Sequence, residues 1–240
     1  MPVVFVHGVP DTPRVWQTLV ARLARRDVVQ LSLPGFGSPV PDGFDASKEA
    51  YVDWLLAELA ALPSPIDLVA HDWGSLLAVR AVSLQPAIAR SWVGGAAPVD
   101  SEYEWHPTAQ MWQTPGVGEA LMEQITPDAM REGLVAAGVP AAAATETASH
   151  VDDLMKRCIL ALYRSAVHAS AEWEGDLGRI TAPGLVLWGE DDPYAVPRFG
   201  ARLAERTGAR FVSYPATSHW WQLERPAEVA AELERFWATL

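Results

Sequence analysis

Short apolar runs alternate with longer amphipathic stretches along most of the chain. Six runs are rich in branched and aromatic residues, which is typical of buried strands: 3–6, 27–31, 66–70, 89–94, 185–188 and 210–214. The stretches between them predict helices over 11–25, 47–62, 75–85, 196–207 and 226–240. Ser47 is the expected N-cap of the second helix, and Leu240 is expected on the buried face of the last. Alternation of this kind implies an α/β fold, with a mostly parallel sheet and helices on both faces.

The alternation is interrupted once, between residues 98 and 178. This segment contains helical patterns broken by Pro127 and Pro140, but no convincing strand. Because strands resume after it, we interpret residues 98–178 as a helical cap inserted into a core made of residues 1–97 and 179–240.

Composition narrows the classes of partner. The 240 residues carry a net charge of −12, from 18 basic and 30 acidic side chains, which argues against nucleic acid or an anionic membrane as a partner. No apolar stretch approaches the roughly 20 residues that span a bilayer, and no signal peptide is evident. The single cysteine, Cys158, fits a reducing compartment. We therefore expect a cytoplasmic protein, either a monomer or a homodimer.

The segment after the third strand has the pattern of a nucleophile elbow. Ala70 and Gly74 flank Asp72 at two residues on either side, and small residues there permit a tight strand-to-helix turn that exposes the central side chain. The competing interpretation is that Asp72 is only an N-cap of the following helix. Ser75 lies one turn further on and is expected to face the packing between sheet and helix.

Two later loops supply partners for such a nucleophile. Residues 189–193 contain three carboxylates directly after a strand, and His219 follows the last strand. Considered alone, residues 189–193 could be a solvated acidic turn, and His219 could be a structural histidine. However, ligands bind beyond the carboxyl ends of parallel strands, and the chain order nucleophile, acid, histidine is that of one fold's catalytic triad.

Five segments together resemble the α/β-hydrolase superfamily over essentially the whole chain. They are His7-Gly8-Val9-Pro10, Leu33-Pro34-Gly35-Phe36-Gly37, His71-Asp72-Trp73-Gly74-Ser75, Leu187-Trp188-Gly189-Glu190-Asp191-Asp192-Pro193 and Ser218-His219. The resemblance implies that Asp192, rather than Asp191, is the acid. The first and third segments are similar to those of epoxide hydrolases and haloalkane dehalogenases, which also implies a cap. No metal or organic cofactor is expected.

The residue types also suggest a chemistry. An aspartate is ionised at neutral pH and suits attack on an sp3 carbon, which gives an ester intermediate. His219, oriented by Asp192, would then activate a water to hydrolyse that ester. The backbone N–H groups of Trp73 and Val9 are the expected donors to the oxyanion.

The two candidate substrates are small electrophiles, an epoxide and a haloalkane, and their leaving groups need different stabilising groups. An epoxide needs an acid, and Tyr163 is our first candidate because Tyr163-Arg164 resembles a pair in epoxide hydrolases; Tyr103 is a second. A halide needs N–H donors, and Trp73 with either Trp105 or Trp112 could supply them. We predict epoxide hydrolysis to a vicinal diol, with dehalogenation as the alternative. A non-catalytic ligand receptor and a hydrolase of activated esters are further alternatives.

The remaining aromatic and imidazole side chains receive supporting roles. Trp220 and Trp221 are expected to line the pocket, and His7 and His71 to pin their loops. The other histidines are interpreted as surface or cap residues: His106, His150 and His168.

Overall fold

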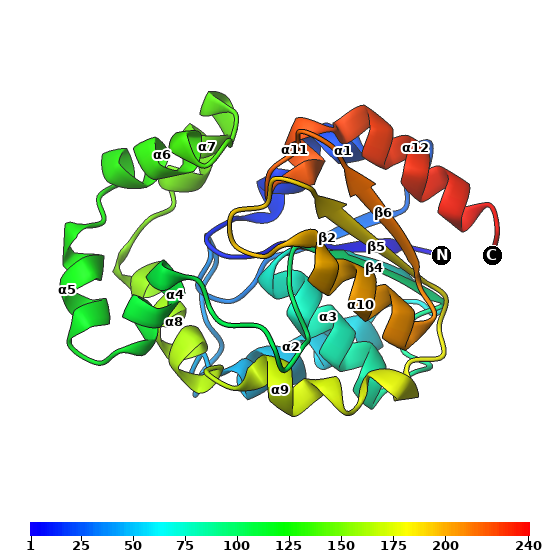
Figure 1. Ribbon diagram of the computed structural model, residues 1–240, viewed down its shortest axis with the longest axis horizontal. Helices are drawn as coiled ribbons and strands as arrows, with labels where there is room; N and C mark the ends of the chain where they lie inside the picture. The colour runs from blue at the N-terminus through cyan, green and yellow to red at the C-terminus, as the bar shows by residue number, and fades with distance from the viewer.

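The computed structural model describes residues 1–240, and one parallel sheet runs through its centre (Figure 1). The strand order is β2-β1-β3-β4-β5-β6, and every neighbouring pair is parallel. The strand bounds are β1 Val3–Val6, β2 Val28–Leu31, β3 Asp67–Ala70, β4 Ser91–Gly95, β5 Gly184–Gly189 and β6 Arg210–Tyr214. All six predicted strands are confirmed, with shifts of at most two residues at their ends.

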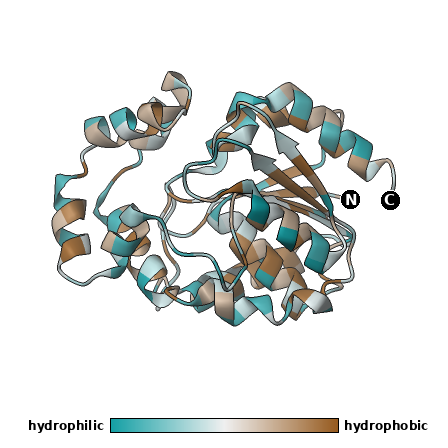
Figure 2. Ribbon diagram, in the orientation of Figure 1, coloured by the Kyte–Doolittle hydropathy of each residue, from teal (hydrophilic) through white to brown (hydrophobic).

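Helices cover both faces of the sheet. The core helices are α1 Gln17–Val20, α2 Lys48–Ala60, α3 Trp73–Leu84, α10 Pro197–Thr207, α11 Trp221–Glu224 and α12 Pro226–Trp237, with short 3-10 turns at η1 Pro13–Trp16 and η2 Leu177–Arg179. Side chains alternate along β1: Val4 and Val6 pack with α2, α3 and α10, whereas Val3 and Phe5 pack with α1, α11 and α12. Figure 2 shows this as brown strands between helices that carry teal on their outer turns.

Between β4 and β5 the chain forms helices only. They are α4 Pro107–Gln113, α5 Val117–Gln124, α6 Pro127–Ala136, α7 Ala141–Ala148, α8 Asp153–Ser165 and α9 Ala169–Glu174. In Figure 1 these green and yellow helices leave the carboxyl ends of the strands, and α5 to α7 extend away from the core. The helical character predicted for residues 98–178 is confirmed, and we refer to this segment, which contains α4 to α9, as the insertion.

Two expectations about helix ends are wrong. The helix predicted over 11–25 is only the short turn η1 followed by α1, which ends at Val20. Beyond it, the Ala24 N–H donates to the Glu234 carboxylate at 2.8 Å and Arg25 pairs with Asp67 at 2.5 Å, so tertiary partners replace helical bonds. Leu240 lies past the end of α12 and is 42% exposed, so it is not part of the buried face.

Candidate active site

Asp72 occupies a strained position between β3 and α3. Its φ of 52° and ψ of −127° are unusual for a non-glycine residue, and its side chain makes no capping hydrogen bond. A Cβ on Gly74 would lie 2.4 Å from the Val6 carbonyl oxygen, so this turn requires glycine there. The alternative that Asp72 is only a helix cap is therefore wrong. Ser75 is buried as expected, and its hydroxyl accepts a hydrogen bond from the Gly95 N–H at 3.0 Å.

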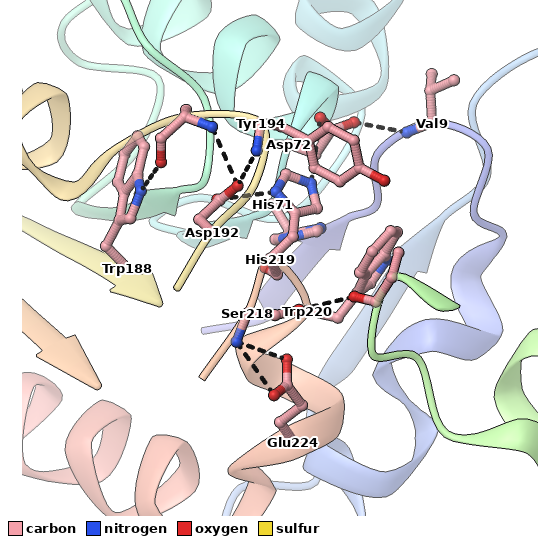
Figure 3. Close-up of polar contacts among 12 residues, drawn as sticks. Val9, His71, Asp72, Trp188, Asp192, Tyr194, Ser218, His219, Trp220 and Glu224 are labelled. Atoms are coloured by element: carbon pink, nitrogen blue, oxygen red, sulfur yellow. Dashed lines mark hydrogen bonds and ion pairs between the residues drawn. The ribbon is translucent and has the colours of Figure 1, made fainter. Parts of the chain in front are cut away.

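Asp72, His219 and Asp192 lie together at the carboxyl ends of β3, β5 and β6 (Figure 3). His219 Nδ1 lies 2.9 Å from Asp192 Oδ2, and His219 Nε2 lies 3.6 Å from Asp72 Oδ2. The second oxygen of Asp192 accepts hydrogen bonds from the N–H groups of Tyr194 and Ala195 at 2.8 and 3.1 Å. Because the Asp192 carboxylate oxygen is the acceptor of this pair, Nδ1 of His219 carries a proton toward Asp192, and Nε2 faces Asp72. Asp191 is exposed and takes no part.

The two oxygens of Asp72 have different surroundings. Oδ1 accepts a hydrogen bond from the Val9 N–H at 2.8 Å, while Oδ2 faces His219. Trp73 is the first residue of α3, so its backbone N–H has no acceptor within the helix. Both N–H groups expected to hold an oxyanion therefore adjoin the nucleophile.

Burial and neighbouring charges shift the pKa values of Asp72 and His219 in opposite directions. Burial raises the pKa of Asp72, but the close approach of His219 at 3.6 Å and its charge outweigh burial and hold the pKa below its ordinary value. Burial lowers the pKa of His219, but Asp192 and then Asp72 outweigh it and hold the pKa above its ordinary value. The resting site is therefore an ionised Asp72 facing an imidazolium.

A mostly apolar cavity of about 260 Å³ opens over Asp72 between the core and the insertion. Of its 23 lining residues 16 are hydrophobic, and the lining includes Asp72, His219 and four aromatic residues of the insertion. These four were all expected from the sequence to contact a substrate: Tyr103, Trp105, Trp112 and Tyr163. The apolar lining favours an uncharged organic substrate.

The hydrogen-bonding groups of these aromatic residues differ in availability. The Tyr103 hydroxyl donates to the Tyr194 carbonyl at 3.3 Å and the Trp105 indole to the Val167 carbonyl at 3.2 Å. By contrast, the buried indole N–H groups of Trp73 and Trp112 have no hydrogen-bond partner. Of the two tryptophans considered as a second halide donor, only Trp112 has a free N–H.

Tyr163 packs edge-on against these rings at the centre of the pocket wall. Its ring lies 5.2 Å from Trp73, 5.4 Å from Trp105 and 4.9 Å from Trp112. Burial, and after it the charge of Asp72, raise the pKa of Tyr163 well above its ordinary value. The phenol is therefore protonated at neutral pH and is available as an acid.

His106 is a pocket residue, so its interpretation as a surface or cap side chain was incomplete. Its Nδ1 accepts a hydrogen bond from the Ala109 N–H at 3.3 Å, as the N-cap of α4, and burial lowers its pKa to about 4. The imidazole is therefore neutral with its proton on Nε2, which makes no hydrogen bond within the protein. The signal in the sequence was Pro107, which favours a helix start directly after His106.

Tyr194 is a second pocket residue that sequence reasoning missed. It lies two residues after Asp192, and its ring packs 4.9 Å from the His219 ring. Proximity in sequence to Asp192 was the available signal.

The loops around the triad are pinned as expected. His7 accepts from the Leu33 N–H at 3.0 Å, and His71 donates from Nε2 to the His219 carbonyl at 2.9 Å. Trp220 lines the pocket and donates its indole N–H to Asp11 at 3.0 Å. Trp221 does not line the pocket, contrary to expectation, because α11 turns it into the core against Trp16.

Two further kinds of feature are absent from the structure. No group of three or more His, Cys, Asp or Glu side chains is arranged to hold a metal ion. None of the helices combines the length and apolar character needed to cross a membrane.

Comparison with known proteins agrees with this geometry. The sequence profile described as the alpha/beta hydrolase family matches residues 3–232. The chain belongs to the alpha/beta hydrolase family. An epoxide hydrolase of Caballeronia sordidicola is 25% identical over 99% of this chain and 88% of its own length. A haloalkane dehalogenase of Mycolicibacterium paratuberculosis is 34% identical over 35% of this chain and 30% of its own.

Solved structures in this hydrolase family share the fold across different chemistries. A haloalkane dehalogenase from Bradyrhizobium elkani superposes with a TM-score of 0.78 at 22% identity, covering 99% of this chain and 91% of its own. An esterase from Thermogutta terrifontis superposes with a TM-score of 0.79 at 20% identity, covering 100% of this chain and 90% of its own. The resemblance to the epoxide hydrolase and dehalogenase branch is confirmed, and the chain is a hydrolase; fold similarity alone does not select its substrate.

Proposed function

We propose that this hydrolase opens an epoxide and releases a vicinal diol, by way of an ester on Asp72. The observation that carries the proposal is a protonated Tyr163 in the same apolar pocket as an ionised Asp72. A three-membered ether needs a nucleophile on carbon and an acid for the departing oxygen, and these two side chains supply both. The epoxide hydrolase relative, similar over nearly the whole chain, supports the same substrate class.

In the first step Oδ2 of Asp72 attacks an epoxide carbon while Oδ1 stays with the Val9 N–H. The C–O bond of the ring breaks, and the leaving oxygen takes the proton of Tyr163. Esterification removes the charge of Asp72, which is one of the two charges that raise the pKa of His219. The imidazolium can then give its proton to the Tyr163 phenolate and become a neutral base.

His106 supplies a second donor to the ring oxygen. Its neutral Nε2–H lines the pocket and has no protein partner, which is the state that an electrophilic hydrogen-bond donor requires. Tyr103, our second candidate from the sequence, already uses its proton on Tyr194.

In the second step neutral His219 takes a proton from water, and the hydroxide attacks the ester carbonyl carbon of Asp72. The oxyanion forms on Oδ1, which already lies 2.8 Å from the Val9 nitrogen, with the Trp73 N–H as second donor. Collapse breaks the bond between Cγ and Oδ2, and the departing alkoxide takes the proton of the hydroxyl that was added, which releases the diol, leaves Asp72 as a carboxylate and leaves His219 as the imidazolium. One water is consumed and every proton is accounted for.

Haloalkane hydrolysis is a second candidate, and one specific observation favours it. The indole N–H groups of Trp73 and Trp112 are buried at the pocket, unpartnered, and suited to a departing halide. The same Asp72 ester would form with loss of halide, and the second step would be unchanged. The partial match to a haloalkane dehalogenase is consistent with this reaction.

Intact mass of a His219→Gln variant tests both reactions. Without the base the ester should accumulate, so an aryl epoxide is expected to add its whole mass, because ring opening loses no atoms. A primary alkyl bromide would instead add only its alkyl group. His219→Gln combined with Asp72→Asn is the control and should gain nothing. Absence of any adduct in folded protein would overturn the proposal and favour a receptor or an ester hydrolase.

Two further variants in the His219→Gln background separate the leaving groups. Tyr163→Phe removes the acid and is expected to slow labelling by the epoxide about 10²-fold or more, while labelling by the bromide is little changed. Trp112→Phe removes one free indole donor and should slow only labelling by the bromide. Equal effects of Tyr163→Phe on both reagents would contradict its role as the ring-opening acid.

A further inference from the structure

One face of α6 forms part of the cavity wall. Ala129, Met130, Gly133 and Leu134 line the cavity from positions i, i+1, i+4 and i+5, with Ile125 beside them. The charged residues of this helix, Asp128, Arg131 and Glu132, do not line it. The part of the cavity wall that α6 contributes is therefore apolar.

Two small residues one turn apart keep this face open. Ala129 and Gly133 are both exposed, and a Cβ placed on Gly133 would meet no atom within 4 Å. Glycine inside a helix costs about 1 kcal/mol relative to alanine, and no close contact or positive φ requires it at this position. Gly133 thus leaves open space at the cavity wall beside Met130 and Leu134, which also line it, and we call this space the α6 groove.

Hydrogen bonds hold α6 in a fixed position relative to the catalytic loop. Ser218, the neighbour of His219, donates its hydroxyl to the Ala137 carbonyl just past the end of α6, at 3.0 Å. On the following helix, Glu146 of α7 accepts from the Thr12 hydroxyl at 3.3 Å and pairs with Arg14 at 3.2 Å. Although α5 to α7 extend away from the core in Figure 1, the α6 face is thus anchored at the pocket.

We propose that the α6 face, at Ala129 and Gly133, is a subsite for the apolar tail of the substrate. On the basis of the proposed function, the substrate class is then a terminal epoxide carrying a hydrocarbon chain without charged or hydrogen-bonding groups. The reactive end lies at Asp72, and the chain runs along the α6 groove. A charged tail end is excluded because nothing on this face would pair with it.

The test measures binding, so it does not depend on catalysis. Quenching of the pocket tryptophans would report dissociation constants for a series of 1,2-alkanediols from butyl to decyl, in the wild-type protein and in two variants. Gly133→Leu fills the groove, whereas Ala136→Leu adds the same side chain on the same helix at a residue outside the pocket lining. Gly133→Leu raises helix propensity and Ala136→Leu lowers it only slightly, so misfolding is not expected.

In the wild-type protein the dissociation constant is expected to fall about fourfold for each buried methylene. Gly133→Leu should shrink the ratio between the butyl and decyl constants at least tenfold, while Ala136→Leu keeps that ratio. No dependence on chain length, or the same change in both variants, would overturn the subsite. Chain-length-dependent binding together with no epoxide adduct in His219→Gln would refute the proposed function and leave the subsite standing.

Discussion

Replacing Asp192 with Asn is expected to stop ester hydrolysis while sparing ester formation. The replacement conserves volume, and the Asn oxygen can still accept from the Tyr194 and Ala195 N–H groups, so the loop should fold as before. The amide nitrogen would then face His219 Nδ1 in place of the carboxylate oxygen at 2.9 Å. Two donors cannot hydrogen-bond, so His219 is expected to take the other tautomer, with a proton on the nitrogen that should accept one from water.

The size of the effect follows from the burial of this contact. The side chains of His219 and Asp192 are 4% and 0% exposed, so water does not replace the lost carboxylate. Loss of a correctly placed general base typically costs about 10²- to 10⁴-fold in rate, or about 3 to 5 kcal/mol of transition-state stabilisation. Ester formation depends on Asp72 and the leaving-group donors, and we expect it to change less than about tenfold.

Quenched-flow mass spectrometry with an aryl epoxide separates the two steps. Asp192→Asn should show rapid gain of the epoxide mass followed by slow loss, and steady-state turnover limited by that loss. Asp191→Asn is the matched control, because Asp191 is the adjacent residue but is exposed, and it should behave as wild type. Steady turnover of Asp192→Asn without a visible ester, or equal effects of the two variants, would refute the assignment of Asp192.

Three stability measurements test other parts of the site. Asp72→Gly is expected to be more stable than Asp72→Ala by about 1 kcal/mol in urea unfolding, because glycine relieves the strain at φ 52°; equal stabilities would show that this turn is not strained. Burial raises the pKa of Asp11 from 3.8 to about 7, although the hydrogen bond from the Trp220 N–H opposes this shift. The folded protein therefore binds a proton that the unfolded chain has lost between these two pH values. The free energy of unfolding should fall as pH rises from about 4 to 7. This loss of folding free energy is at most about 4 kcal/mol. In Asp11→Asn the urea midpoint should vary less with pH across that range; the same pH dependence as in the wild-type protein would contradict the shift. Gly74→Ala should cost about 3 kcal/mol or more because its Cβ would lie 2.4 Å from a β1 carbonyl oxygen, whereas Gly175→Ala, with no atom within 4 Å, should cost little.

The sheet and the catalytic group were predictable because local signals encode them. Each strand is a short apolar run, and the residues after three of the strands are Asp72, Asp192 and His219. Parallel strands place their carboxyl ends at one edge, so the order of strands in the sequence was enough to bring these side chains together. Residues separated by up to 148 positions, such as His71 and the His219 carbonyl, meet for this reason alone.

The aromatic pocket wall was only partly predictable, because local patterns do not specify which N–H groups remain free. Trp105 and Trp112 look equivalent in the sequence, but the Val167 carbonyl, 62 positions from Trp105, consumes one indole and leaves the other free. His106 was missed for a similar reason: its role depends on its own Nδ1 capping α4, which fixes the proton on the nitrogen that lines the pocket. Which N–H groups remain free depends on how the helices of the insertion pack against one another. The periodicity of hydrophobic residues in the sequence does not encode that packing.

The division of labour between core and insertion explains why one site supports two candidate reactions. In the proposed mechanism the core supplies Asp72, His219 and Asp192, which would perform the same ester hydrolysis whatever group has departed. Three of the four leaving-group donors, Tyr163, His106 and Trp112, belong to the insertion. A change of leaving group would therefore require changes mainly in the insertion, and under the proposed mechanism the reaction depends on whether the phenol or the indoles contact the departing atom. If Tyr163→Phe abolishes labelling by the epoxide while Trp112→Phe does not, the phenol performs that role, and the free indoles serve as the apolar and polarisable wall behind it.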